Sequence, residues 1–242
     1  MKVAVVFLGT ARYINFFPGL YASAEEKLFP GTDKEYFVFT DADFDGEVPD
    51  NIHVIYQENL GFPGINLQTY EIIQKSFDKM SHCDYFFFMD ADTIVANPVQ
   101  LDEVFPEGKP LCCVHHPCHF LKMVPNDRFP GSFDTNPEST ACVKEGESFD
   151  VYWQSCIWGG TMDECKKLVD TLTENTRIDE ENGVMAKWHD ESHMNRYLLN
   201  NIELVHTLHP RFAYPEVFKS MLDWEPKIVH LAKENSEYQV DV

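Results

Sequence analysis

The sequence has little positive charge: 19 Lys and Arg residues stand against 40 Asp and Glu residues, a formal net charge of -21. A protein this negative repels nucleic acid and anionic membrane surfaces, so we expect neither as a partner. The same charge repels a nucleoside diphosphate, and a site for such a ligand would need a bound cation or helix N-termini to neutralise it locally. The charge balance therefore points to a metal ion if the substrate carries phosphates.

The sequence also lacks a cysteine pattern and a long apolar run. Its seven cysteines are odd in number and contain no Cys-x-x-Cys pair, which argues against a complete disulfide framework and a zinc knuckle. No apolar stretch reaches the roughly 18 residues of a membrane helix. The N-terminal MKVAVVFLGT has no small-residue cleavage site, so it predicts a first strand and not a signal peptide. We expect reduced thiols, no membrane anchor and a cytoplasmic location.

Four apolar runs bounded by turn residues predict buried parallel strands at 3–8, 36–40, 52–56 and 85–89. Helical stretches at 20–29 and 67–80 alternate with them, which predicts an open α/β sheet. After residue 97 the chain becomes irregular and rich in Pro, Gly and His. Strand candidates follow at 111–116 and 148–158, and amphipathic helices at 162–176 and 191–199. With 44% apolar residues and no evident linker, the chain reads as one domain.

The strongest local motif is the apolar strand YFFFM, which runs directly into Asp90-Ala91-Asp92. Ligands of open α/β sheets bind at the carboxyl ends of strands, and residues two apart point to the same side of an extended segment. Carboxylate oxygens in that arrangement suit Mg²⁺ or Mn²⁺ bridging to phosphates. A plain strand-end turn can carry the same residues, as Asp41-Ala42-Asp43 illustrates, and for Asp43 a solvated turn is the better interpretation.

The segment from Trp188 to His193, WHDESH, gathers ionisable groups at the start of an amphipathic helix. The helix dipole alone would favour Asp190 and Glu191 there, but it does not account for a Trp and two His beside them. Paired carboxylates next to a Trp are common in sugar sites. The indole covers the apolar face of a pyranose, and the carboxylates bind hydroxyls or stabilise an oxocarbenium-like centre.

Two further motifs carry weaker signals. Trp158-Gly159-Gly160-Thr161 allows either a close approach of the backbone to a ligand or a tight turn. The histidines His115, His116 and His119 lack a companion carboxylate, which disfavours a metal cluster. One of them, His116, stays a candidate contact to substrate.

In their order along the chain, these pieces resemble glycosyltransferase family 6, the retaining α-1,3-galactosyl- and N-acetylgalactosaminyltransferases that include the ABO blood-group enzymes. The likeness covers nearly the whole sequence and is carried by RYI, SAEEKLFPGTDKEYFVFTD, FFFMDAD, IWGGT and KWHDESHMNRYLLNN. It implies a GT-A fold in one catalytic domain, 1–242. Residues 1–97 would then form the nucleotide-sugar-binding half and 98–242 the acceptor-binding and catalytic half.

The resemblance also implies roles for individual residues. Asp90 and Asp92 would hold the metal on the UDP diphosphate. Glu191 would be the nucleophile or the stabiliser of an oxocarbenium-like ion pair, Asp190 would bind donor hydroxyls, and Trp188 would face the acceptor. The other implied contacts are Leu8, Gly9, Thr10 and Tyr13 with Asp90 around uridine, and Gln154, Cys156, His189 and His116 around the sugars.

The sequence departs from the family at two places. An arginine before the Asp-x-Asp strand is absent and aligns with Gln68 or Thr69, and the basic C-terminal tail appears as SEYQVDV, with only Lys233 nearby. Both departures concern how the donor is enclosed. The absence of a Golgi anchor or stem suggests a bacterial or phage product, although this sequence keeps both aspartates where bacterial relatives often have Asn-x-Asn and need no metal.

The expected activity is transfer of galactose, or of glucose, from a UDP-sugar to an oligosaccharide in an α-1,3 linkage, with Mn²⁺ or Mg²⁺ and some UDP-sugar hydrolysis. Cys156 is bulkier than the Gly or Ala that accompanies N-acetylgalactosamine, so it should exclude an N-acetyl group. A haloacid-dehalogenase-like phosphohydrolase is an alternative because 90–94 approximates its motif, but Ile94 departs from it and no later Gly-Asp-x-x-x-Asp follows. A second alternative is a UDP-sugar-binding protein with weak turnover.

Overall fold

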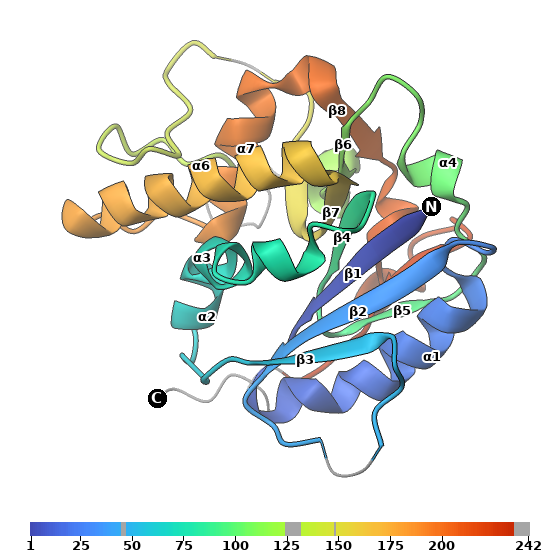
Figure 1. The fold of residues 1–242 in the computed structure, drawn as a ribbon. Helices are drawn as coiled ribbons and strands as arrows, with labels where there is room; N and C mark the ends of the chain where they lie inside the picture. Colours follow the sequence, from blue (N-terminus) through green and yellow to red (C-terminus); the bar gives the residue numbers. More distant parts are fainter. Residues whose placement is uncertain (45–46, 124–131, 148, 235–242) are drawn as a thin grey trace.

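The computed structural model describes residues 1–44, 47–123, 132–147 and 149–234, and it shows a mixed sheet with helices on both faces (Figure 1). The order of the seven strands in this sheet is β3-β2-β1-β4-β7-β6-β8, and a second sheet has the order β5-β10-β9. The strands are β1 (Lys2–Leu8), β2 (Asp33–Thr40), β3 (Ile52–Tyr56), β4 (Tyr85–Met89), β5 (Thr93–Val95), β6 (Leu111–His115), β7 (Trp153–Thr161), β8 (Val205–Leu208), β9 (Tyr214–Pro215) and β10 (Ile228–His230).

The first four strands are parallel neighbours, as their continuous apolar runs predict. The chain leaves β1 towards β2 and β3 on one side, then returns to place β4 on the other side of β1. This reversal opens a crevice outside the carboxyl ends of β1 and β4, the usual place for a ligand in such a sheet. β7 runs antiparallel to β4 and β6, so the sheet is mixed beyond β4.

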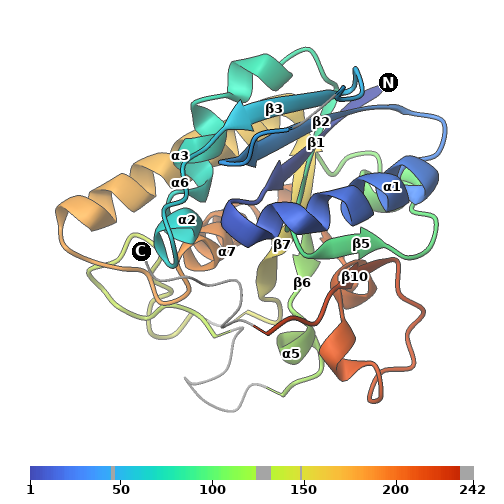
Figure 2. The ribbon, with the colours of Figure 1, turned by 90° about the horizontal axis from the view of Figure 1, so that it is seen from below.

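Seven α-helices pack around the sheet in the described residues. α1 covers one face, and α3, α6 and α7 lie against the other (Figures 1 and 2). The helices are α1 (Phe17–Lys27), α2 (Gly64–Leu67), α3 (Thr69–Gln74), α4 (Leu101–Val104), α5 (Pro117–Phe120), α6 (Met162–Glu181) and α7 (Asp190–Asn200). Short 3₁₀ turns cover Ala11–Phe16, Phe77–Met80, Ile202–Leu204, Pro210–Ala213 and Glu216–Phe218.

Strand alternation divides the core into two clusters, one on each face. In β1, Val3, Val5 and Phe7 pack with α1, while Ala4 and Val6 pack on the side of α3 and α6. The helix expected at 162–176 is confirmed, with Cys165, Leu168, Val169 and Leu172 on its buried face. Because both faces of the sheet are packed, the strand ends that carry the site residues are held in a fixed position.

Two predicted elements differ from the observed ones. The helix expected at 67–80 is interrupted after Gln74, and Phe77 and Met80 of the following 3₁₀ turn still belong to the core. The strand expected at 148–158 begins at Trp153 and continues to Thr161; Ser148 lies outside the described residues.

The two glycines of β7 serve strand packing. A Cβ on Gly159 would lie 2.3 Å from the carbonyl oxygen of Phe86, and one on Gly160 would lie 2.2 Å from that of Pro110. The expectation that these glycines approach a ligand or form a turn is therefore wrong. They sit inside a strand, pressed between its two neighbours.

In the part of the chain that the structure describes, no helix combines the length and the apolar character needed to cross a bilayer. All seven cysteines are free thiols, and all but Cys142 are buried.

Candidate active site

A cavity of about 220 Å³ opens at the carboxyl ends of β1 and β4. Its wall includes five of the predicted nucleotide-binding residues and both metal candidates. The lining residues are Leu8, Gly9, Thr10, Ala11, Tyr13, Asn59, Gly61, Phe62, Ile65, Asn66, Thr69, Phe88, Asp90, Ala91, Asp92, Ser155, Asp190, His230 and Lys233.

The loop after β1 forms one wall of the cavity. Gly9 is tied to the neighbouring strand by a hydrogen bond from its N–H to the Phe39 carbonyl at 2.9 Å. A Cβ at this position would lie 2.5 Å from the Phe7 ring, so the close passage of the loop needs glycine. The Thr10 hydroxyl is 3.2 Å from Asn59 Oδ1, which links this loop to the opposite wall.

The two aspartates of the second Asp-x-Asp, Asp41 and Asp43, lie in different surroundings. Asp41 Oδ1 accepts from the N–H of Ala11 at 2.7 Å and so braces the loop after β1. Asp43 is exposed, which confirms the solvated-turn interpretation for that residue.

Asp90 and Asp92 stand directly beyond β4. The backbone N–H of Asp90 donates to the Cys156 carbonyl at 2.8 Å, and the Thr93 hydroxyl donates to the Asp90 carbonyl at 2.7 Å. Burial and the charge of Asp92 raise the pKa of Asp90. Burial also raises the pKa of Asp92, but the hydrogen bond and charge of His230 and the charge of Lys233 lower it by more.

Two basic side chains contact Asp92, although the sequence lacks the family arginine at the aligned positions. Asp92 Oδ2 lies 3.0 Å from His230 Nε2 and also contacts Lys233 Nζ. Gln68, one of the two aligned positions, donates instead to Glu180 Oε1 at 2.5 Å. Thr69, the other, lines the cavity and donates its hydroxyl to the Ile65 carbonyl at 3.0 Å. The tail 236–242 lies outside the described residues.

The donor atoms fit a divalent cation. Asp90, Asp92 and His230 each offer one ligand atom, and these atoms lie within 4.8 Å of one another. Carboxylate oxygens with one imidazole nitrogen are ligands that Mn²⁺ accepts, and carboxylates suit Mg²⁺. A buried pair of like charges is also stabilised by a cation between them.

Asp190 and Glu191 begin α7, where they meet an irregularity in β7. Between Gln154 and Trp158 the strand loses its register with β6, and this bulge turns Ser155 towards the cavity. The Ser155 N–H donates to Glu191 Oε2 at 3.3 Å, and the Tyr152 hydroxyl donates to Glu191 Oε1 at 2.8 Å. A bulge beside a site often aims a group in this way.

Burial raises the pKa of Asp190 to about 7 and that of Glu191 to about 8. The charge of Asp90 adds to both shifts, and the charge of Asp190 adds to that of Glu191. A site that holds two acids in a poorly solvated place is one that gains from a positively charged reaction centre.

The raised pKa of Asp190 predicts a pH-dependent stability difference. Between about pH 4 and pH 7 the folded chain binds more protons at this site than the unfolded chain, so its contribution to the unfolding free energy falls as pH rises. In Asp190→Asn this loss is absent. We expect urea unfolding in the presence of chelator to show the variant gaining about 1–3 kcal/mol relative to the parent between pH 5 and pH 8. An unchanged difference across this range would contradict the shift.

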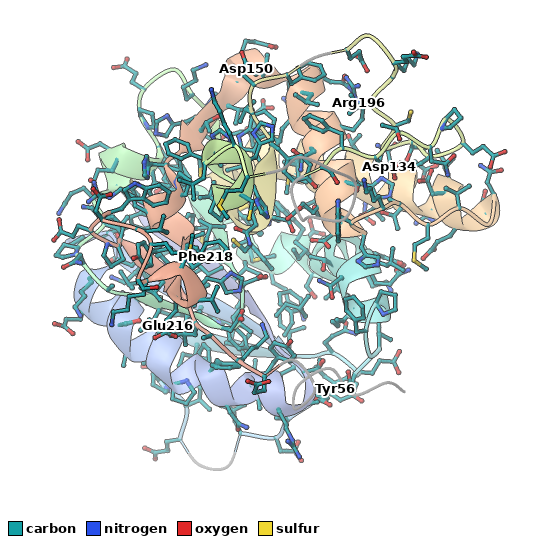
Figure 3. The ribbon with its side chains drawn as sticks, turned by 180° about the vertical axis from the view of Figure 1, so that it is seen from behind. Tyr56, Asp134, Asp150, Arg196, Glu216 and Phe218 are labelled. Carbon is teal, nitrogen blue, oxygen red and sulfur yellow. The ribbon has the colours of Figure 1, made fainter. Side chains whose placement is uncertain are left out.

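The predicted acceptor residues flank this pair. Trp188 Nε1 donates to Ser132 Oγ at 3.3 Å, and its backbone N–H donates to Ser192 Oγ at 2.9 Å. Asp134, labelled in Figure 3, accepts from the Lys187 N–H at 2.8 Å and so fixes the segment that leads to Trp188. His189 has a φ of 50°, and its ring meets that of Phe62 edge-on at 5.3 Å.

None of the five predicted sugar contacts lines the cavity: Trp188 and His189 flank Asp190 and Glu191 as described above, and the other three lie elsewhere. Cys156 is 2% exposed and packs in the apolar cluster on the α1 face, because the bulge turns Ser155 to the cavity in its place. Gln154 is absent from the lining. His116 is buried, accepts from the Cys118 N–H at 3.2 Å and caps α5. Burial lowers the pKa of His116 to about 3.

The placement of Cys156 predicts the outcome of removing its side chain. Cys156→Gly should lower the unfolding free energy by about 1–3 kcal/mol, because a buried side chain leaves a void. The ratio of activities with UDP-galactose and UDP-N-acetylgalactosamine should stay within about threefold, since a lost pocket contact would be worth about 1–3 kcal/mol. A larger change in that ratio would show that Cys156 does help to select the donor sugar.

Several site residues escape sequence analysis. Ser155 is hidden because the bulge that exposes it has no local signature, and Tyr152 because it is one of ten tyrosines in an aromatic-rich chain. Phe62, in the turn-like GFPG, and Asn59 lie in a segment whose only signal is its turn chemistry.

Comparison with known proteins gives a match over the whole length. The model of glycosyltransferase family 6 covers residues 1–240. The O-antigen biosynthesis glycosyltransferase WbnI of Escherichia coli is 28% identical over 242 residues, which are 98% of this chain and 97% of that protein.

Animal relatives match over a smaller part of their length. The human globoside alpha-1,3-N-acetylgalactosaminyltransferase 1 is 27% identical over 210 residues, 83% of this chain and 58% of that protein. The rat histo-blood group ABO system transferase 2 is 25% identical over 205 residues, 81% of this chain and 59% of that protein. The chain thus spans less than two thirds of these animal relatives.

Proposed function

Because this chain belongs to glycosyltransferase family 6, we propose that it moves a hexose from a UDP-sugar to a glycan acceptor in an α-1,3 linkage, with retention of the anomeric configuration. Its mixed α/β fold is of the GT-A type found in that family. Membership over the whole chain sets aside the phosphohydrolase interpretation. The linkage follows the human relative, whose name specifies an alpha-1,3 transfer.

One observation carries the proposal. The loop after β1, the pair Asp90 and Asp92, and Asp190 all line the same cavity, with Glu191 next in the chain. A nucleoside diphosphate bound between the loop and the two aspartates would direct its sugar towards α7. The carboxylates of α7 are the groups of this site suited to a developing positive charge at carbon.

Each residue then has a chemical task. The bond between the anomeric carbon and the UDP oxygen breaks with its electron pair leaving on UDP, and the Glu191 carboxylate stabilises the positive carbon or bonds to it. The acceptor oxygen forms the new bond, and its proton passes to the departing UDP. Tyr152 and the Ser155 N–H hold Glu191 in place, and Asp190 binds donor hydroxyls. When bound, Mn²⁺ or Mg²⁺ supplies the charge that stabilises the diphosphate.

The donor is a UDP-hexose, with UDP-galactose first and UDP-glucose second, by the family resemblance. The test is a panel of UDP-sugars that includes UDP-N-acetylgalactosamine, with Mn²⁺, in which UDP release is measured with and without oligosaccharide acceptors. Release that depends on an acceptor, with an α-linked product by NMR, is the expected result. Release independent of every acceptor would reduce the activity to hydrolysis, and binding without release would make the chain a UDP-sugar-binding protein.

A further inference from the structure

The C-terminal strand β10 is joined to the Asp90–Asp92 segment through its backbone. β10 pairs antiparallel with β5, so that His230 lies opposite Thr93, and the N–H of Leu231 donates to the carbonyl of Asp92 at 2.8 Å. Asp92 immediately precedes β5. The strand pairing therefore fixes His230 beside Asp92, although 138 residues separate them.

The segment that follows β10 is anchored as well. The N–H of Ala232 donates to Glu216 Oε2 at 2.9 Å, and Glu216 lies on the 3₁₀ turn that follows β9 (Figure 3). β10 also pairs with β9 on its other side. The His230 imidazole is thus carried by a strand held on both edges, which is the kind of support that a metal ligand requires.

The imidazole completes a set of donors of mixed type. Its Nε2 lies 3.0 Å from Asp92 Oδ2, and one ligand atom from each of Asp90, Asp92 and His230 falls within 4.8 Å of the others. Two carboxylate oxygens alone offer a cation little more than charge. An added nitrogen shifts preference from Mg²⁺ towards Mn²⁺ and other first-row transition ions.

Lys233 shares the same oxygen. Its ammonium contacts Asp92 Oδ2 and lies 5.1 Å from the centre of the Tyr13 ring. An ammonium and a divalent cation cannot both sit against one carboxylate oxygen without strong repulsion. In this arrangement Lys233 neutralises Asp92 at the position where a cation would bind.

We propose that His230 is a third protein ligand of the divalent cation held by Asp90 and Asp92, and that Lys233 is a counter-ion which the cation displaces from Asp92. This inference rests on the metal role proposed above for the two aspartates. It makes the metal site specific to Mn²⁺-like ions and able to bind them before UDP arrives.

The direct test is the electron spin echo of Mn²⁺ bound to the intact chain, with less than one equivalent of Mn²⁺ and no nucleotide. An imidazole nitrogen in the coordination sphere gives ¹⁴N modulation, which changes to the ¹⁵N pattern when the protein is made with ¹⁵N-histidine. We expect this modulation in the parent and its loss in His230→Gln, together with at least a roughly tenfold rise in the Kd for Mn²⁺.

A matched control is His82→Gln, because Glu35, His82 and Cys83 form the other cluster of possible ligands in the described residues. The ¹⁴N signal should persist in His82→Gln. If the signal were lost, the bound Mn²⁺ would lie at the cluster that contains His82, and the inference would be overturned. Lys233→Met should keep the signal and tighten Mn²⁺ binding several-fold, since the competing ammonium is gone. Weaker binding in that variant would refute the displacement.

The outcomes also separate this inference from the proposed metal role. Mn²⁺ bound without ¹⁴N modulation would overturn the role of His230 and leave Asp90 and Asp92 as the ligands. Absence of Mn²⁺ binding, both alone and with added UDP, would overturn the inference and the metal role together. Circular dichroism of His230→Gln, whose backbone pairing in β10 does not need the ring, checks that the fold is retained.

Discussion

Replacing Glu191 by Gln is expected to lower kcat by three or more orders of magnitude and to leave the affinity for UDP within about threefold. The exchange keeps the shape of the side chain but removes its ability to ionise, and the proposed reaction needs the carboxylate when positive charge develops at the anomeric carbon. The amide can still accept a hydrogen bond from the Ser155 N–H, and the Tyr152 hydroxyl can rotate to accept one from the new NH₂ group. The loss should therefore fall on the chemical step, as measured by single-turnover kinetics with the best donor.

The matched control is Glu181→Gln, the same chemical change at an exposed position at the end of α6. It should leave both kcat and UDP binding unchanged. UDP affinity is measured by calorimetry in the presence of Mn²⁺. If affinity fell in parallel with kcat in Glu191→Gln, the residue would be part of the nucleotide site or of its folding, and the role in catalysis would be lost.

The strands that carry the site could be predicted because their sequences are unusually simple. A parallel strand buried on both faces must be apolar throughout, and Val3 to Phe7 and Phe86 to Met89 satisfy that demand. Once these strands are identified, the polar residues at their carboxyl ends follow from the topology of an open sheet. Asp90 and Asp92 were predicted here from that topology, and Leu8, Gly9 and Thr10 from the family resemblance; all five line the cavity.

The opposite wall could not be predicted, because tertiary contacts decide it. His230 belongs to a strand of three residues, too short for any periodic signal. Ser155 reaches the cavity only because β7 bulges against β6. In a regular strand, neighbouring side chains point to opposite faces, and the sequence alone would not say whether Ser155 or Cys156 faces the cavity. The glycines at 159 and 160 looked like turn residues, but the closeness of two neighbouring strands requires them.

The absence of the family arginine can be compared with the basic residues that the structure places near Asp92. A cavity that would bind a diphosphate needs positive charge, and the arginine that the family resemblance implies is absent from the aligned positions, Gln68 and Thr69. The structure brings Lys233 and His230 to the same aspartate from the far end of the chain. The negative charge of the site is thus compensated by residues that the fold brings together. These residues lie far along the chain from the position where the alignment expects the arginine.

The second large effect concerns the metal. Turnover should be abolished by excess chelator, restored by Mn²⁺, and reduced at least about a hundredfold in Asp92→Asn, because the leaving diphosphate loses its charge partner. The neutral amide would also leave Lys233 and His230 without the carboxylate that they share. Rates with saturating UDP-hexose at several Mn²⁺ concentrations would separate weaker metal binding from slower chemistry.

The chain supplies its own control for this experiment in Asp43→Asn, the same substitution in the other Asp-x-Asp, at an exposed carboxylate. That variant should keep the activity and the Mn²⁺ dependence of the parent, since Asp43 does not line the cavity. Full activity of the parent in excess chelator would refute metal dependence. In that case Lys233 would be the cation that neutralises the diphosphate, and Lys233→Met would abolish turnover while Asp92→Asn would not.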